Sequence, residues 1–219
     1  MIAPIINHYK KLSFQNVENR TALCQCGEKP HDHPACKINF FVDCCIKIKD
    51  KNLEGDVAEC GVFKGGSARI LATVFEDKKI LLFDTFTGLP EDDAHPEGTL
   101  KRGGFGEVTL DEVKEYLSDK DNCLFYPGWF PKSAQRSSLW QNDKKFSFVH
   151  LDMDLYQSTK TGIEFFWKKL VNGGAIIFDD FKGVDTPGIE QSIIEFFENR
   201  NDYSSEVYPS MCIIYKKET

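Results

Sequence analysis

Two short acidic clusters each follow an apolar run in the second half of the chain. The acids are Asp152, Asp154, Asp179 and Asp180. The runs before them, residues 146–151 and 175–178, are typical of buried strands in a parallel sheet, which binds ligands beyond its carboxyl edge. Neighbouring strands lie about 4.8 Å apart, so these carboxylates would converge and repel one another. A hard divalent cation such as Mg, Ca or Mn would resolve that repulsion. The alternative is that the acids cap the helices that follow.

A glycine-rich turn at residues 59–67 follows another apolar run. It lacks the Lys that a P-loop places after its last glycine, because Ser67 follows Gly66. It also lacks the dinucleotide-binding spacing, because position 63 is Phe. An acid, Glu59, facing a helix N-terminus suits a ligand that carries both an ammonium and a carboxylate, such as S-adenosylmethionine. The alternative is a turn whose glycines serve tight packing alone.

Asp84 directly follows the next apolar run, residues 79–83. At this strand end it could accept hydrogen bonds from ribose hydroxyls. This position extends the predicted cofactor site from the first strand to the second.

Five segments, in this order and spacing, resemble the macrocin O-methyltransferase family. They are DVAECGVFKGGS at 56–67, FDTFTGLP at 83–90, GWFP at 128–131, LDMDLYQST at 151–159 and GGAIIFDD at 173–180. Members of that family are class I, S-adenosylmethionine-dependent and metal-assisted sugar O-methyltransferases. The resemblance implies a Rossmann-like, mostly parallel seven-stranded sheet whose last strand is antiparallel. It also implies a sugar or glycoside acceptor and a homo-oligomer.

The resemblance also implies roles for single residues. Asp152, Asp179 and Asp180 would be metal ligands, with Mg as the expected ion, and Asp154 would be the general base. Together with the acid and glycines of the turn, the predicted cofactor-binding residues are Glu59, Gly61, Gly65, Gly66, Ser67, Asp84, Thr85, Phe86 and Asp152.

The base has two candidates. Asp154 lies two residues after Asp152, so an extended backbone would put both side chains on one side of the chain. The alternative role of Asp154 is to cap the next helix. His150 shares the same alternation and is the second candidate, although a strand histidine is more often a hydrogen-bonded core residue.

Helices and strands alternate from residue 52 onward, which predicts an α/β fold with helices on both faces of the sheet. Strands are expected at 57–61, 79–83, 123–126, 146–151, 175–178 and 211–215, and helices at 67–75, 109–118, 159–170 and 188–199. Thr109 and Glu112 predict a capping box, and residues 172–174 (Asn-Gly-Gly) predict a helix end. In the last helix, we expect an apolar side formed by Ile189, Ile193, Ile194, Phe196 and Phe197. Trp129 and Phe130 follow Gly128 in a loop where they could flank the adenine or the acceptor.

Residues 1–50 differ in composition, and we expect them to form a helical and loop cap on a catalytic domain at 51–219. Five side chains could supply a tetrahedral zinc site, although their spacing matches no familiar zinc finger. They are Cys24, Cys26, His31, His33 and Cys36. The alternative is a loop with inert thiols, and Cys44 and Cys45 are expected to pack in a helix.

Composition excludes several classes of partner. The formal charge is −7 and there is no run of Lys or Arg, so no nucleic-acid groove is expected. There is no apolar stretch of membrane-spanning length and no signal-peptide pattern, so we expect no membrane partner, a cytoplasmic location and reduced thiols.

Two other functions compete with methyl transfer. A magnesium-dependent phosphohydrolase of the haloacid-dehalogenase type would use Asp152 and Asp154 as its acidic pair, but that pair normally opens the fold. Here two strands and the glycine turn precede it. A non-catalytic, methyltransferase-like binding protein would be expected to lose the acids or the turn, and both are present.

Overall fold

The computed structural model describes residues 37–92, 95–136 and 143–218. The helices are α2 (Lys37–Lys49), α3 (Gly66–Val74), α4 (Leu110–Tyr116), α5 (Lys132–Arg136), α6 (Tyr156–Lys169) and α7 (Pro187–Phe197). The strands are β1 (Asp56–Cys60), β2 (Ile80–Asp84), β3 (Cys123–Pro127), β4 (Phe146–Leu151), β5 (Leu170–Phe181), β6 (Tyr203–Tyr208) and β7 (Ser210–Lys216). Within these ranges, no helix is long and apolar enough to cross a membrane.

The strands form one seven-stranded sheet in the order β3-β2-β1-β4-β5-β7-β6. The first five strands pair in parallel, and β7 is antiparallel to both of its neighbours. The predicted sheet with an antiparallel last strand is therefore confirmed. Its central strand β4 is buried at every position, as expected for a continuous apolar run covered on both faces.

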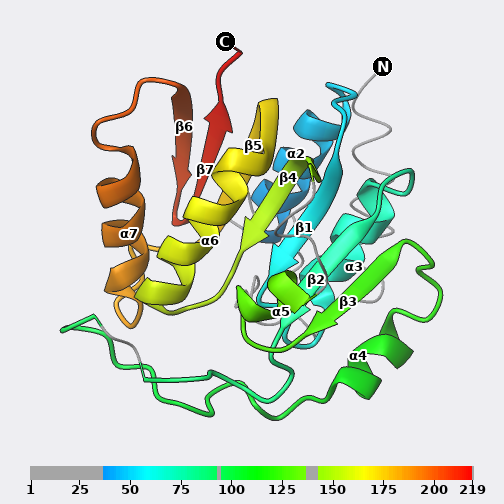
Figure 1. Ribbon diagram of the computed structural model, residues 1–219, viewed down its shortest axis with the longest axis vertical. Helices are drawn as coiled ribbons and strands as arrows, with labels where there is room; N and C mark the ends of the chain where they lie inside the picture. Colours follow the sequence, from blue (N-terminus) through cyan, green and yellow to red (C-terminus); the bar gives the residue numbers. More distant parts are fainter. Residues whose placement is uncertain (1–36, 93–94, 137–142, 219) are drawn as a thin grey trace.

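Helices cover both faces of the sheet, as predicted (Figure 1). Side chains of α2 and α3 form one apolar cluster with strand residues such as Val57 and Phe148. Side chains of α6 and α7 form a second cluster with Ala58 and Val149. Adjacent strand residues thus belong to opposite clusters, because successive side chains of a strand point to opposite faces.

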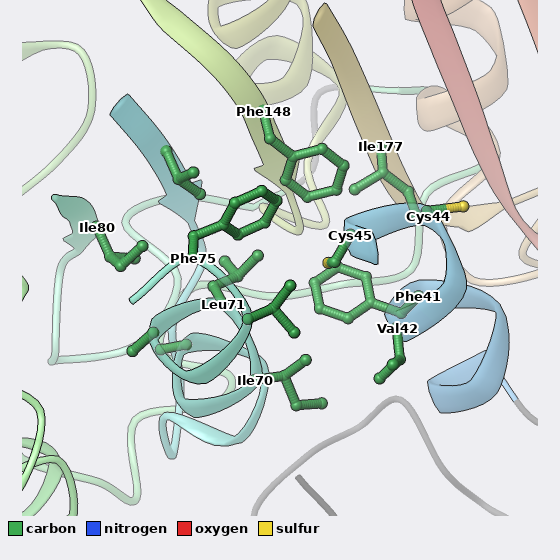
Figure 2. Packing of buried hydrophobic residues seen from close by; sticks show 14 of the residues in the cluster. Phe41, Val42, Cys44, Cys45, Ile70, Leu71, Phe75, Ile80, Phe148 and Ile177 are labelled. Atoms are coloured by element: carbon green, nitrogen blue, oxygen red, sulfur yellow. The ribbon is translucent and has the colours of Figure 1, made fainter. Parts of the chain in front are cut away.

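Helix α2 is part of the first cluster, and Figure 2 shows its side chains facing those of α3 and the sheet. Cys44 and Cys45 are buried in this helix as predicted, and burial raises the pKa of the Cys44 thiol to about 12. Phe41 is fully buried, with its ring centroid 4.7 Å from that of His150 and 6.3 Å from that of Phe148. The division of the chain at residue 50 stays a prediction.

Most predicted elements occur with boundaries shifted by a few residues, but four details differ. Helix α6 begins at Tyr156, before the expected position 159. Strand β5 begins at Leu170, directly after α6, so the residues Asn-Gly-Gly lie inside the strand. Strand β6 has no apolar run to predict it, because four of its six residues are exposed. Ile194 is 53% exposed, so it does not belong to the buried side of α7.

The long segment between β2 and α4 passes along the lower edge of the sheet in Figure 1, where β1 and β4 end. The segment ends at Thr109, the N-cap of α4, and the predicted capping box between Thr109 and Glu112 is present. It is therefore anchored at both ends, by a strand and by a capped helix, and it supplies part of the site described below.

Replacing Phe41 by Ala should lower the free energy of unfolding by about 3–5 kcal/mol, because it leaves a cavity between α2 and β4. Denaturant unfolding would measure the loss. Ile194→Ala is the control and should cost less than about 0.5 kcal/mol, since this side chain is largely exposed. Equal losses in the two variants would show that α2 is not packed as described.

Candidate functional site

A pocket lies beyond the carboxyl ends of strands β1 to β5. Its lining comes from the last residues of some of these strands, from the segments that follow them and from α6. The lining residues are Gly61, Phe63, Phe83, Asp84, Thr85, Gly88, Leu89, Pro90, Phe105, Gly128, Trp129, Phe130, Asp152, Met153, Asp154, Ser158 and Asp180. This is where an open α/β sheet is expected to bind its ligand.

Several residues of the pocket have a left-handed backbone, which is unfavourable for residues other than glycine. The φ angles are 48° at Phe63, 60° at Phe105, 61° at Asp154 and 52° at Asp180. Each such residue costs of order 1–3 kcal/mol, and such residues cluster at binding and active sites. The surrounding fold therefore stabilises backbone strain at the two acids and at two aromatic side chains of the pocket.

The predicted convergence of carboxylates is present in the structure. Oxygens of Asp152, Asp154 and Asp180 lie within 4.8 Å of one another. A second, overlapping group consists of His150, Asp152 and Asp179, whose possible ligand atoms lie within the same distance. The parallel pairing of β4 and β5 brings the two acidic segments together. The two groups include all three predicted metal ligands as well as Asp154.

The backbone conformation that places Asp154 in the cluster differs from the expected one. Its left-handed φ of 61° replaces the extended backbone that would have put it on the same side as Asp152. The N-cap of α6 is Leu155, which makes no side-chain cap hydrogen bond, so Asp154 does not cap the helix. Its side chain lines the pocket instead.

Burial and the crowding of like charges raise the pKa values of Asp152 and Asp154. Burial raises the pKa of Asp152 well above its usual value, and the neighbouring carboxylates raise it further. The pKa of Asp154 is raised for the same reasons, with Asp180 as the largest charge effect. A cation bound among these carboxyl groups would offset both effects and favour their ionised forms.

Sequence reasoning did not single out Lys37, which is the first residue of α2. Its Nζ lies 2.6 Å from Oδ1 of Asp179 and 3.1 Å from Oδ1 of Asp180. Burial alone lowers the pKa of Lys37, but the two carboxylates outweigh that effect and raise it. Asp152 and Asp154 form no ion pair with any residue in the described part of the chain.

His150 and Glu59 form a buried pair below the pocket. They occupy paired positions on β4 and β1, and His150 Nδ1 lies 2.8 Å from Glu59 Oε1. Both side chains are fully buried, and neither lines the pocket. Glu59 Oε2 and His150 Nε2 have no hydrogen-bond partner among the described residues. These orphaned atoms are unusual in a buried site and indicate a missing partner such as a ligand, ion or water.

The residues predicted to bind the cofactor divide into two groups. Gly61, Asp84, Thr85 and Asp152 line the pocket. Glu59, Gly65, Gly66, Ser67 and Phe86 do not line it. Gly65 is the N-cap of α3, has a φ of 84° and makes no side-chain cap hydrogen bond, so it leaves the start of the helix uncapped.

Asp84, the last residue of β2, forms hydrogen bonds with the backbone of the glycine turn. Its Oδ2 accepts hydrogen bonds from the backbone N–H groups of Val62 and Phe63, at 2.7 and 2.9 Å. Its Oδ1 accepts one from Phe86 N–H at 2.7 Å. Hydrogen bonds from a ribose would have to share these two oxygens.

Trp129 and Phe130, which were expected near the ligand, line the pocket together with Phe63 and Phe105. Trp129 is 37% and Phe105 43% exposed, so both rings are accessible to a ligand. Phe105 was missed because it lies in a polar, glycine-rich loop without a recognisable motif. The proposed zinc ligands between Cys24 and Cys36 lie outside the described residues.

Comparison with known proteins places the chain in a family. The model of the Macrocin-O-methyltransferase (TylF) family matches residues 35–209, which is most of the chain. The chain belongs to the macrocin O-methyltransferase family. This membership confirms the resemblance found in the sequence and favours methyl transfer over the phosphohydrolase alternative.

Curated relatives that match the chain are named as O-methyltransferases. The chain is 28% identical over 153 residues to the 8-demethyl-8-(2,3-dimethoxy-alpha-L-rhamnosyl)-tetracenomycin-C 4'-O-methyltransferase of Streptomyces olivaceus, covering 63% of this chain and 57% of that protein. It is 25% identical over 160 residues to the demethyldecarbamoylnovobiocin O-methyltransferase of Streptomyces niveus, covering 66% of this chain and 60% of that protein. The chain thus spans less than two thirds of the length of these two relatives.

Solved structures support the fold. The O-methyltransferase NovP superposes with a TM-score of 0.66 at 21% identity, covering 83% of this chain and 80% of that chain. The calicheamicin methyltransferase CalS11 superposes with a TM-score of 0.64 at 17% identity, covering 97% and 91%. The sheet is therefore that of class I O-methyltransferases.

Replacing Gly61 by Ala should disturb the acidic cluster directly. Gly61 has a φ of 86°, and an added Cβ would overlap the backbone carbonyl oxygen of Asp152. Gly103→Ala is a matched control, because Gly103 has the same φ but no atom within 4 Å of an added Cβ. The control should lose about 1–2 kcal/mol from backbone strain, and Gly61→Ala clearly more, as measured by denaturant unfolding. Similar losses would mean that β1 and Asp152 are not in close contact.

Proposed function

We propose that the protein is an S-adenosylmethionine-dependent O-methyltransferase that acts on a hydroxyl of a sugar, glycoside or similar small acceptor, with a divalent metal. The observation that carries this proposal is the group of carboxylates Asp152, Asp154 and Asp180 in the same pocket as Gly61 and Asp84. The proposed metal site and the predicted cofactor turn would thus be adjacent. Family membership supports the reaction type.

The residues of the glycine turn fit the cofactor. Glu59 Oε2 is buried without a partner among the described residues, which suits an acceptor for the ammonium of the methionine moiety. The uncapped start of α3 suits its carboxylate, because helix N-terminal amides carry partial positive charge. The aromatic side chains of the pocket are available to the adenine, and a ribose at Asp84 would share carboxylate oxygens that already accept backbone N–H groups.

The acids fit a divalent cation. Four carboxylates meet at this edge of the sheet, and Lys37 is the only described cation that pairs with any of them. Asp152, Asp179 and Asp180 are the ligands we propose, and their all-oxygen chemistry suits Mg, Ca or Mn. When bound, such a cation would lower the pKa of an acceptor hydroxyl and of the surrounding carboxyl groups.

The base we propose is Asp154. S-adenosylmethionine would supply the methyl group and leave as S-adenosylhomocysteine, and Asp154 would take the proton that the acceptor hydroxyl loses as its oxygen is methylated. Asp154 lines the pocket. His150, the second candidate, is fully buried and held by Glu59, so it is better suited to positioning than to proton transfer from the acceptor.

The relatives and the pocket support the proposed acceptor class. One relative is the mycinamicin III 3''-O-methyltransferase of Micromonospora griseorubida, and one similar structure is that of a TDP-rhamnose 3'-O-methyltransferase. The accessible rings of Trp129 and Phe105 offer apolar surface to the carbon face of a sugar or to an attached aglycone. The homo-oligomer and the cytoplasmic location stay predictions.

The proposal is tested by calorimetric titration with S-adenosylmethionine, with and without Mg²⁺, followed by an acceptor screen over nucleotide sugars and glycosides. Methylated product and S-adenosylhomocysteine should appear together. A phosphomonoester should not be hydrolysed. Phosphate release without cofactor binding would overturn the proposal in favour of the phosphohydrolase.

Replacing Asp154 by Asn keeps the shape of the side chain but removes the proton acceptor. We expect kcat to fall about 10²- to 10⁴-fold, while the dissociation constant of S-adenosylmethionine changes little. Asp185→Asn, an exposed acid that accepts a hydrogen bond from Thr99, is the control and should leave kcat unchanged. An unchanged kcat in Asp154→Asn would contradict the base role, and a parallel loss of cofactor binding would instead assign Asp154 to the cofactor site.

A further inference from the structure

Lys37 occupies the position where the proposed metal site needs free oxygen atoms. Its ammonium lies 2.6 Å from Asp179 Oδ1 and 3.1 Å from Asp180 Oδ1, and these are two of the three proposed ligands. Asp179 Oδ1 also accepts a hydrogen bond from Asp180 N–H at 2.8 Å. Little acceptor capacity remains on that oxygen, because a carboxylate oxygen has only two lone pairs.

An ammonium and a divalent cation cannot share this cluster without cost. Like charges a few Å apart repel by several kcal/mol in a partly buried site. Asp179 is 2% exposed, so water screens the interaction poorly. A cation that enters between the acids must therefore displace Lys37 or bind against its charge.

The local structure allows the lysine side chain to move while its helix stays in place. Phe41 and Val42 pack the first turns of α2 into the core (Figure 2), and Ile38 next to Lys37 is also buried, which fixes the backbone there. The Lys37 side chain is 19% exposed, so part of it already lies at the surface. Rotation of its flexible four-carbon stem is sufficient to free both oxygens.

We propose that Lys37 is a built-in counter-ion that competes with the divalent cation for Asp179 and Asp180. This inference rests on the metal site of the proposed function. Without the metal, Lys37 neutralises part of the acidic cluster and stabilises the fold. With the metal, the ammonium leaves, and the strength of the Lys37 ion pairs sets the metal affinity of the site.

The experiment compares Lys37→Met with Lys47→Met. Met keeps the apolar stem and removes the charge. Lys47 lies on the same helix and pairs at 3.0 Å with Glu206 on β6, which contributes no residue to the acidic cluster. The Lys47 variant therefore controls for the loss of one positive charge. Calorimetry with Mg²⁺ alone, and thermal unfolding with and without Mg²⁺, are measured on the full chain.

We expect Lys37→Met to bind Mg²⁺ about tenfold more tightly, or better, because the competitor is gone. Its Tm without metal should fall below that of the wild type, because the buried Asp179 loses its partner. Added Mg²⁺ should raise its Tm by more than it raises that of the wild type. Lys47→Met should bind Mg²⁺ as the wild type does, and Lys37→Arg should retain the weaker binding.

Three outcomes would overturn the inference. Equal or weaker Mg²⁺ binding by Lys37→Met would show that the lysine does not compete, while Mg²⁺ binding by the wild type would leave the proposed function standing. An equal gain in Mg²⁺ affinity in Lys47→Met would show that the effect comes from the change in net charge and not from the position of Lys37. Absence of Mg²⁺ binding in every variant would remove the metal site itself, and the inference with it.

Discussion

The repulsion among four carboxylates at one edge of the sheet is the constraint on which the rest of the structure depends. Parallel pairing of β4 and β5 forces the acids together, because both strands end at the same edge. Burial and the neighbouring carboxylates both raise the pKa values of Asp152 and Asp154, so ionising this cluster costs free energy. A fold without a use for this cluster would be more stable with apolar or neutral side chains there.

The backbone around the cluster is organised to hold it against that repulsion. Asp152 N–H donates a hydrogen bond to the carbonyl of Cys60 at 2.8 Å. Gly61, which follows Cys60, has no side chain, so the end of β1 and the segment at Asp152 can lie in close contact. Asp154 and Asp180 themselves have a left-handed backbone, and both residues line the pocket. The strain at these positions is local, and the two apolar clusters on either face of the sheet offset it.

Sequence patterns predicted the features that depend on local periodicity. Apolar runs located six strands, and the acids after two of them indicated the convergence that Asp152 and Asp180 display. Other features depend on contacts between distant segments. Lys37 meets Asp180 across 143 positions of the chain, and no spacing rule predicts such a pair. No apolar pattern predicts the left-handed backbone at Asp154, because tertiary structure determines it. No such pattern predicts the exposed edge strand β6 either, because it forms by pairing with β7.

The strand order has a consequence for how this site can diversify. The half of the sheet formed by β1, β2 and β3 presents the glycine turn and Asp84, while the half formed by β4 and β5 presents the acids. Loops on one half can vary without moving residues on the other. Parallel pairing of β1 with β4 joins the halves, and the Glu59–His150 pair and the contact of Gly61 with Asp152 also cross this junction. New acceptor preferences can thus arise by altering the pocket rim while the junction between the halves is inherited unchanged.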